Sequence, residues 1–118
     1  MPYSEVFKDH LAHPRNGGEI DNANAIADET NPVCGDRVRL SLKVEDGLIK
    51  DSRFLAYGCP PTLVCASVLM TMIDEKTVTA ALKITRSDLI EAVGGLPSRK
   101  HHAAALVIET LRAALEKI

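Results

Sequence analysis

The sequence of 118 residues contains no tryptophan, and aromatic residues make up only 3% of it. This scarcity argues against nucleic-acid binding by base stacking, which depends on exposed aromatic side chains. Neither sign of charge dominates, because the chain has 14 lysines and arginines, 16 aspartates and glutamates and a formal net charge of −2. A basic surface for nucleic acid or for an anionic membrane is therefore not expected.

Long apolar runs are also missing from the sequence. The longest apolar stretch, residues 62–73, is interrupted by Thr and Ser and is shorter than the roughly 20 residues that a membrane-spanning helix needs. The first residues show no basic segment followed by an apolar one, so no targeting peptide is expected. Three cysteines, an odd number, favour a reducing, cytoplasmic setting and metal or redox chemistry over a disulfide framework.

The order of apolar and polar residues predicts an α+β fold in a single domain over residues 1–118. A short helix is expected at 4–11, and the polar residues 18–33 predict a loop with one short strand near Ile20. Strict alternation predicts a strand at 37–44, and a turn at 45–47 joins it to a second strand at about 48–57 in an antiparallel hairpin. Helical periodicity predicts helices at 60–75, 78–82, 88–93 with Ser87 as the cap, and from 97 onward.

Two cysteines lie at the open end of this predicted hairpin. Cys34 and Asp36 precede the first strand, and Cys59 follows the second. Antiparallel pairing brings these positions together, although 25 residues separate the two cysteines in the sequence. Glycines beside both cysteines allow a ligand to approach the backbone closely. Two thiolates and a carboxylate suit an iron–sulfur cluster or zinc, and we favour this interpretation over two buried cysteines without a role.

The third cysteine and a pair of histidines complete the candidates. Cys65 lies six residues beyond Cys59 in a predicted helix and among apolar residues, so we expect it to be buried and not to be a ligand. His101 and His102 lie near the start of the last helix, and their side chains point about 100° apart, so at most one can face a common site. No nucleophile with a base and an orienting partner is evident, so an enzyme is not expected.

Five segments, in order along the chain, have the residues of a known family. They are Tyr3-Ser4, Asp9-His10, Pro14-Arg15-Asn16, Asn31-Pro32-Val33-Cys34-Gly35-Asp36 and Tyr57-Gly58-Cys59. They resemble the IscU/NifU N-terminal family of iron–sulfur cluster scaffolds. The resemblance implies a SufE/NifU-type fold, with a small three-stranded antiparallel sheet packed by helices. It also implies assembly of a [2Fe–2S] cluster from iron and from sulfur supplied by a cysteine desulfurase, followed by transfer to apo iron–sulfur proteins.

One position departs from the family pattern. Family members hold the cluster with three cysteines and the aspartate of Cys-Gly-Asp, so the resemblance carries Cys34, Asp36 and Cys59 over directly. The third cysteine of the family follows a histidine, which corresponds to His102 here, but Ala103 occupies the position of that cysteine. The resemblance therefore implies that iron or a [2Fe–2S] cluster is bound by two thiolates, one carboxylate and one imidazole.

The missing cysteine leaves three interpretations of the chain. The first is a cluster scaffold or carrier with an altered site. The second is a zinc-binding regulatory or interaction module that no longer assembles clusters, because the same four ligands complete a zinc tetrahedron. The third is a protein without metal that keeps the fold and a desulfurase-binding surface. The dedicated Hsp70-type chaperone of the family is a less expected partner, because Ser98 and Arg99 replace a proline and a valine of its recognition segment.

Overall fold

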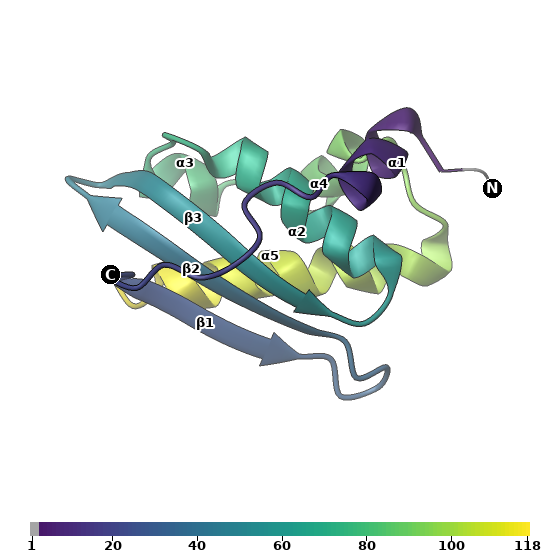
Figure 1. The fold of residues 1–118 in the computed structure, drawn as a ribbon, viewed down its shortest axis with the longest axis horizontal. Helices are drawn as coiled ribbons and strands as arrows, with labels where there is room; N and C mark the ends of the chain where they lie inside the picture. Colours follow the sequence, from purple (N-terminus) through teal and green to yellow (C-terminus); the bar gives the residue numbers. More distant parts are fainter. Residues whose placement is uncertain (1–2) are drawn as a thin grey trace.

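One antiparallel sheet, covered on one face by two long helices, organises the computed structural model, which describes residues 3–118 (Figure 1). The strand order is β1-β2-β3, and α5 packs on β1 and β2 while α2 packs on β3. The expected α+β fold is confirmed. The elements are α1 (Glu5–Ala12), β1 (Ala25–Thr30), β2 (Arg37–Glu45), β3 (Leu48–Tyr57), α2 (Pro60–Ile73), α3 (Val78–Leu82), α4 (Arg86–Ala92), the 3-10 helix η1 (Ser98–Lys100) and α5 (His101–Leu115).

The β2–β3 hairpin has the alternation that the sequence predicts. The apolar side chains of β2 are buried beneath the helices, and the polar side chains alternate with them. The turn places Asp46 and Gly47 at φ angles of 54° and 75°, the left-handed conformation that suits a two-residue hairpin. Strand pairing ends at Arg37 and Tyr57. The residues before β2 and after β3 therefore leave the sheet at the same end.

The first strand lies at Ala25–Thr30 and not near Ile20, so that expectation was wrong. Two alanines of β1 are buried, and small side chains at these positions let α5 pack closely on the strand. The side-chain amide of Asn24 donates to the Val44 carbonyl at 2.7 Å and accepts from the Val44 N–H at 2.8 Å. Pairing with β2 therefore imposes the strand on residues with weak intrinsic preference for it, a tertiary effect that the sequence pattern does not contain.

The predicted helices occur close to their expected ranges, with one correction at α4. This helix begins at Arg86 because Thr85, and not Ser87, is its N-cap. The Thr85 hydroxyl accepts from the Asp88 N–H at 3.1 Å, and the Asp88 carboxylate accepts from the Thr85 N–H at 2.9 Å. This reciprocal capping box satisfies two N–H groups at once, which explains the earlier start. Within residues 3–118, no helix combines the length and apolar character needed to cross a membrane.

A buried hydrogen bond fastens α1 to α2. Nδ1 of His10 lies 2.7 Å from Oγ of Ser67, and the same oxygen accepts from the Arg15 N–H at 2.8 Å. The Ser67 hydroxyl thus links the His10 ring to the backbone of the segment that follows α1. Burial, with the nearby positive charge of Arg15, holds the pKa of His10 below its usual value of 6.5.

This lowered pKa predicts a pH-dependent stability. The unfolded chain takes up a proton at His10 near pH 6.5, whereas the folded chain resists it, so the stabilisation is complete above that pH. We expect the free energy of unfolding to fall as the pH decreases below 6.5 toward the folded-state pKa. Urea unfolding across this range measures it, and His10→Gln is expected to remove this part of the pH dependence. The same pH dependence in His10→Gln would contradict the assignment to His10.

Candidate metal centre

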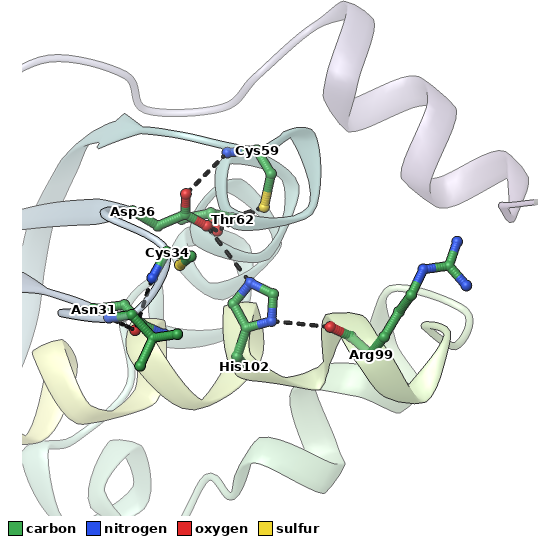
Figure 2. A network of polar contacts seen from close by, with 8 residues as sticks. Asn31, Cys34, Asp36, Cys59, Thr62, Arg99 and His102 are labelled. Carbon is green, nitrogen blue, oxygen red and sulfur yellow. Dashed lines mark hydrogen bonds and ion pairs between the residues drawn. The ribbon is translucent and has the colours of Figure 1, made fainter.

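The four candidate ligands lie at one end of the sheet (Figure 2). Cys34 and Asp36 come from the loop between β1 and β2, and Cys59 directly follows β3 as the N-cap residue of α2. His102 comes from the first turn of α5. The hairpin thus delivers three of these side chains, and the start of the last helix delivers the fourth.

The loop that carries Cys34 is held by Asn31. The Asn31 side-chain oxygen accepts from the N–H groups of Val33 at 2.9 Å and Cys34 at 3.4 Å. The Asn31 carbonyl accepts from the Gly35 N–H at 2.8 Å, and its own N–H donates to the Asp36 carbonyl at 2.7 Å. These bonds close a tight turn in which Gly35 has a φ of 79° and the Cys34 thiol is exposed.

Asp36 is the most buried of the four, with 5% of its surface exposed. Its Oδ2 accepts from the Thr62 hydroxyl at 2.8 Å and from the Cys59 thiol at 3.0 Å, and its Oδ1 accepts from the Cys59 N–H at 3.3 Å. Burial by itself raises the pKa of Asp36, but the hydrogen bonds from Cys59, Thr62 and Cys34 together outweigh burial and lower it. The carboxylate is therefore ionised at neutral pH and available to a cation.

Gly58 makes room for this carboxylate. Its φ is 133°, and a Cβ atom at this position would overlap the carboxylate of Asp36. We expect Gly58→Ala to displace Asp36 and Cys59, to weaken metal binding and to lower the free energy of unfolding by about 1–3 kcal/mol. Isothermal titration with Zn²⁺ and urea unfolding measure both effects.

Gly47→Ala is the matched control for this substitution. Gly47 also has a positive φ, of 75°, but no atom lies within 4 Å of the position of an added Cβ. The control should therefore lose stability through backbone strain alone and keep its metal affinity. Equal metal affinity in the Gly58→Ala and Gly47→Ala variants would show that the space left by Gly58 does not matter for metal binding.

The imidazole of His102 points into the site and that of His101 does not. Nδ1 of His102 lies 3.1 Å from the carbonyl oxygen of Arg99, and this contact favours a proton on Nδ1. Nε2 is then left with its lone pair toward Asp36, whose Oδ2 is 3.7 Å away (Figure 2). His101 instead contacts the carbonyl of Leu96 at 3.0 Å. The expectation that only one of the two histidines can face the site agrees with these contacts.

Three of the four candidate ligands are close enough for a shared metal. One ligand atom each from Cys34, Asp36 and His102 lie within 4.8 Å of one another. Cys59 does not belong to this group, although its sulfur lies 3.0 Å from Oδ2 of Asp36. Ligand atoms of a tetrahedral zinc ion lie roughly 3.6 Å apart, given bonds of about 2.0–2.3 Å. The three side chains are thus more open than a closed zinc site, and the Cys59 sulfur would have to turn toward them to act as a fourth ligand.

Among residues 3–118, no third thiolate lies at the site in place of Ala103. Ala103 is fully buried in the packing of α5. Cys65 is also fully buried, as expected, and burial together with the nearby Cys59 raises the pKa of its thiol to about 12. Cys65 therefore stays protonated at neutral pH, which argues against a role as a metal ligand.

Two contributors to the site were missed by the sequence analysis. The Thr62 hydroxyl contacts both Asp36 and Cys59, and the backbone carbonyl of Arg99 orients His102. The only sequence signal for Thr62 is its position three residues after Cys59, in the first turn of a helix, where its side chain can lie above the N-cap residue. A backbone carbonyl leaves no signal in the sequence.

The site lies on an open surface. Val33, next to Cys34, is 95% exposed. Tyr57 at the end of β3 is half exposed, and the Arg37 guanidinium lies 5.5 Å from the centre of its ring while it also donates two hydrogen bonds to Asp28. Of the candidate ligands, the Cys34 thiol is thus open to solvent, whereas Asp36 stays buried.

Comparison with known proteins identifies the family of this chain. Residues 2–118 match the family model described as the NifU-like N terminal domain. The chain is 41% identical over 113 residues to "Iron-sulfur cluster assembly scaffold protein IscU 1" of Archaeoglobus fulgidus, covering 96% of this chain and 74% of that protein. It is 34% identical over 119 residues to the scaffold protein IscU of Escherichia coli, covering 98% and 92%.

Solved structures show the same fold. A nitrogen-fixing NifU-like protein (N-terminal) from Brucella abortus superposes with a TM-score of 0.83 at 16% identity, covering 98% of this chain and 92% of that one. A putative iron–sulfur cluster assembly scaffold protein from Fervidobacterium islandicum superposes with a TM-score of 0.79 at 22% identity, covering 96% of each. With the sequence match over nearly the whole chain, the conclusion is that this protein belongs to the NifU-like N-terminal domain family.

Proposed function

We propose that this protein is a non-enzymatic scaffold for iron–sulfur cluster assembly and that it holds iron or a [2Fe–2S] cluster as cargo. The observation that carries the proposal is the convergence of Cys34, Asp36 and His102 within 4.8 Å, with Cys59 in contact with Asp36. Proteins 34–41% identical to this chain are named as iron–sulfur cluster assembly scaffolds, which supports the same function here.

Each of the four side chains would supply one ligand to the iron or the cluster. Cys34 and Cys59 supply thiolates, the ligands that iron–sulfur clusters prefer. Asp36 supplies a carboxylate oxygen, and Nε2 of His102 supplies an imidazole nitrogen in the place of a third thiolate. A neutral nitrogen ligand raises the reduction potential of a cluster relative to thiolate, as in Rieske centres, so we propose a higher potential than a three-cysteine site would give.

The proposed partners follow from this role. A cysteine desulfurase would supply sulfur, and apo iron–sulfur proteins would receive the cluster. Cys34 is the one cysteine of the three that is exposed, so we propose that the sulfur donor meets the protein there. Three free cysteines suit a reducing compartment such as the cytoplasm.

Cluster transfer tests the proposal. The protein is reconstituted under argon with ferric iron and sulfide, desalted, and mixed with an apo-ferredoxin that takes a [2Fe–2S] cluster. We expect the ferredoxin spectrum to appear faster than in a control that contains only the same iron and sulfide. A protein that binds no cluster, or that keeps its cluster throughout, would contradict a scaffold role.

A second candidate function is zinc binding without cluster assembly, in a regulatory or interaction module. The observation that favours it is the donor set itself, since a sulfur, an oxygen and a nitrogen from Cys34, Asp36 and His102 lie within 4.8 Å of one another, and Cys59 could add the fourth ligand of a zinc coordination shell. This candidate expects a colourless protein with one zinc ion that excludes iron during reconstitution.

A further inference from the structure

Thr62 contacts the candidate ligands without being one of them. Its hydroxyl donates to Oδ2 of Asp36 at 2.8 Å and lies 3.4 Å from the Cys59 sulfur. The side chain is fully buried in the first turn of α2, so water does not compete for this hydroxyl. Its partner Asp36 is itself 95% buried, since only 5% of its surface is exposed.

The hydroxyl of Thr62 and a bound metal ion would both stabilise the negative charge of the Asp36 carboxylate. A buried carboxylate needs donors, and Asp36 obtains them from Thr62 and from the thiol and N–H of Cys59. Oδ2, the carboxylate oxygen that accepts from Thr62, is also the one that lies 3.7 Å from Nε2 of His102, so it faces the other candidate ligands. An ion bound at Oδ2 would compete with the hydroxyl for the same oxygen. The hydroxyl of Thr62 therefore stabilises the empty site more than the filled one.

We propose that Thr62 is a positioning residue that weakens metal retention by stabilising the empty form of the site. The proposal rests on the proposed function only in using the same ligands, and it would hold equally for zinc or for iron. By this account a scaffold releases its metal ion more easily, because the Asp36 carboxylate accepts a hydrogen bond from Thr62 when the ion leaves.

The test is Co²⁺ binding to the metal-free protein under argon, measured by competition with a chelator. Thr62→Val keeps the size of the side chain and removes the hydroxyl, so it destabilises the empty site more than the filled one. We expect it to tighten Co²⁺ binding about tenfold, as the loss of a hydrogen bond to a charged group implies. Thr62→Ser keeps the hydroxyl and should bind as the parent does.

Two further variants separate this role from a structural one. Thr110→Val removes another fully buried hydroxyl, which donates to the Leu106 carbonyl at 2.7 Å, and should leave Co²⁺ affinity unchanged. On an Asp36→Asn background, Thr62→Val should no longer change the affinity, because the carboxylate on which it acts is gone. The thiolate-to-Co²⁺ absorption bands should keep their shape in Thr62→Val, since the sulfur ligands are the same.

Three outcomes would overturn the proposal. One is an unchanged Co²⁺ affinity in Thr62→Val, with equal loss of thermal stability in the empty and loaded forms, which is the result for a purely structural hydroxyl. Another is weaker binding, which would mean that Thr62 orients Asp36 as a ligand. The third is the same tightening on the Asp36→Asn background. None of these measurements uses iron or sulfide, so failure of cluster assembly leaves their interpretation intact.

Discussion

The Ala103→Cys variant is expected to hold a reconstituted [2Fe–2S] cluster longer than the parent, with a lifetime on the order of tenfold greater. Residue 103 follows His102 in the first turn of α5, and the family resemblance implies a third cysteine at this position. A thiolate is a softer ligand for iron than an imidazole and carries a negative charge that the ferric cluster favours. The measurement is the decay of cluster absorbance under argon and then in air. The variant should also accept sulfur from a desulfurase more readily.

Ala104→Cys is the matched control for this variant. Ala104 is also fully buried and is the next residue of the helix, so a sulfur there meets a similar packing cost, about 100° away around the helix axis. We expect Ala104→Cys to bring no gain in cluster lifetime. Equal yields and lifetimes in the parent and in Ala103→Cys would mean that the site is complete with His102 and that Ala103 is no defect.

Substitution of either hairpin cysteine is expected to abolish stable cluster binding. Cys34→Ser and Cys59→Ser each remove one of two thiolates, and no other thiolate is available because Cys65 is buried with a pKa of about 12. We expect metal retention to fall by at least about a hundredfold in each variant. Iron and sulfide analysis after anaerobic desalting measures this loss.

Cys65→Ser is expected to lower the stability of the protein but to leave its cluster content unchanged. A serine hydroxyl in this fully buried position lowers the free energy of unfolding by about 1–3 kcal/mol, because it must find a partner among apolar neighbours. Cluster content at 10 °C or below, measured per folded chain, should equal that of the parent. Loss of metal with an intact fold in Cys65→Ser would show that Cys65 belongs to the site.

The hairpin and the helices could be predicted because their signals are local. Residues 37–44 alternate strictly and lead into a turn with glycine at a positive-φ position, and this pattern alone sets the end of the sheet at which both Cys34 and Cys59 lie. The first strand could not be predicted in place, because Ala25–Thr30 has little intrinsic preference for extended structure. Its location depends on the Asn24–Val44 hydrogen bonds and on the packing of α5, which are long-range.

The candidate site, too, could be predicted from the sequence only in part. The proximity of Cys34, Asp36 and Cys59 follows from the hairpin, whereas the approach of His102 was implied only by the family resemblance. The role of Thr62 depends on the direction of one hydroxyl between the first turn of α2 and the β1–β2 loop, and no periodicity contains that information. The space that Gly58 leaves for Asp36 is likewise a contact between residues far apart in the sequence.

The most direct measurement is the metal content and visible spectrum of the protein purified anaerobically from cells grown with ample iron. Our account predicts a brown protein with iron and acid-labile sulfide in equal amounts and with sulfur-to-iron charge-transfer absorption. A His102→Ala variant should change that spectrum, since the nitrogen ligand is then lost. A colourless protein that contains one zinc ion and takes up no iron on reconstitution would contradict the account and would favour the zinc-binding module.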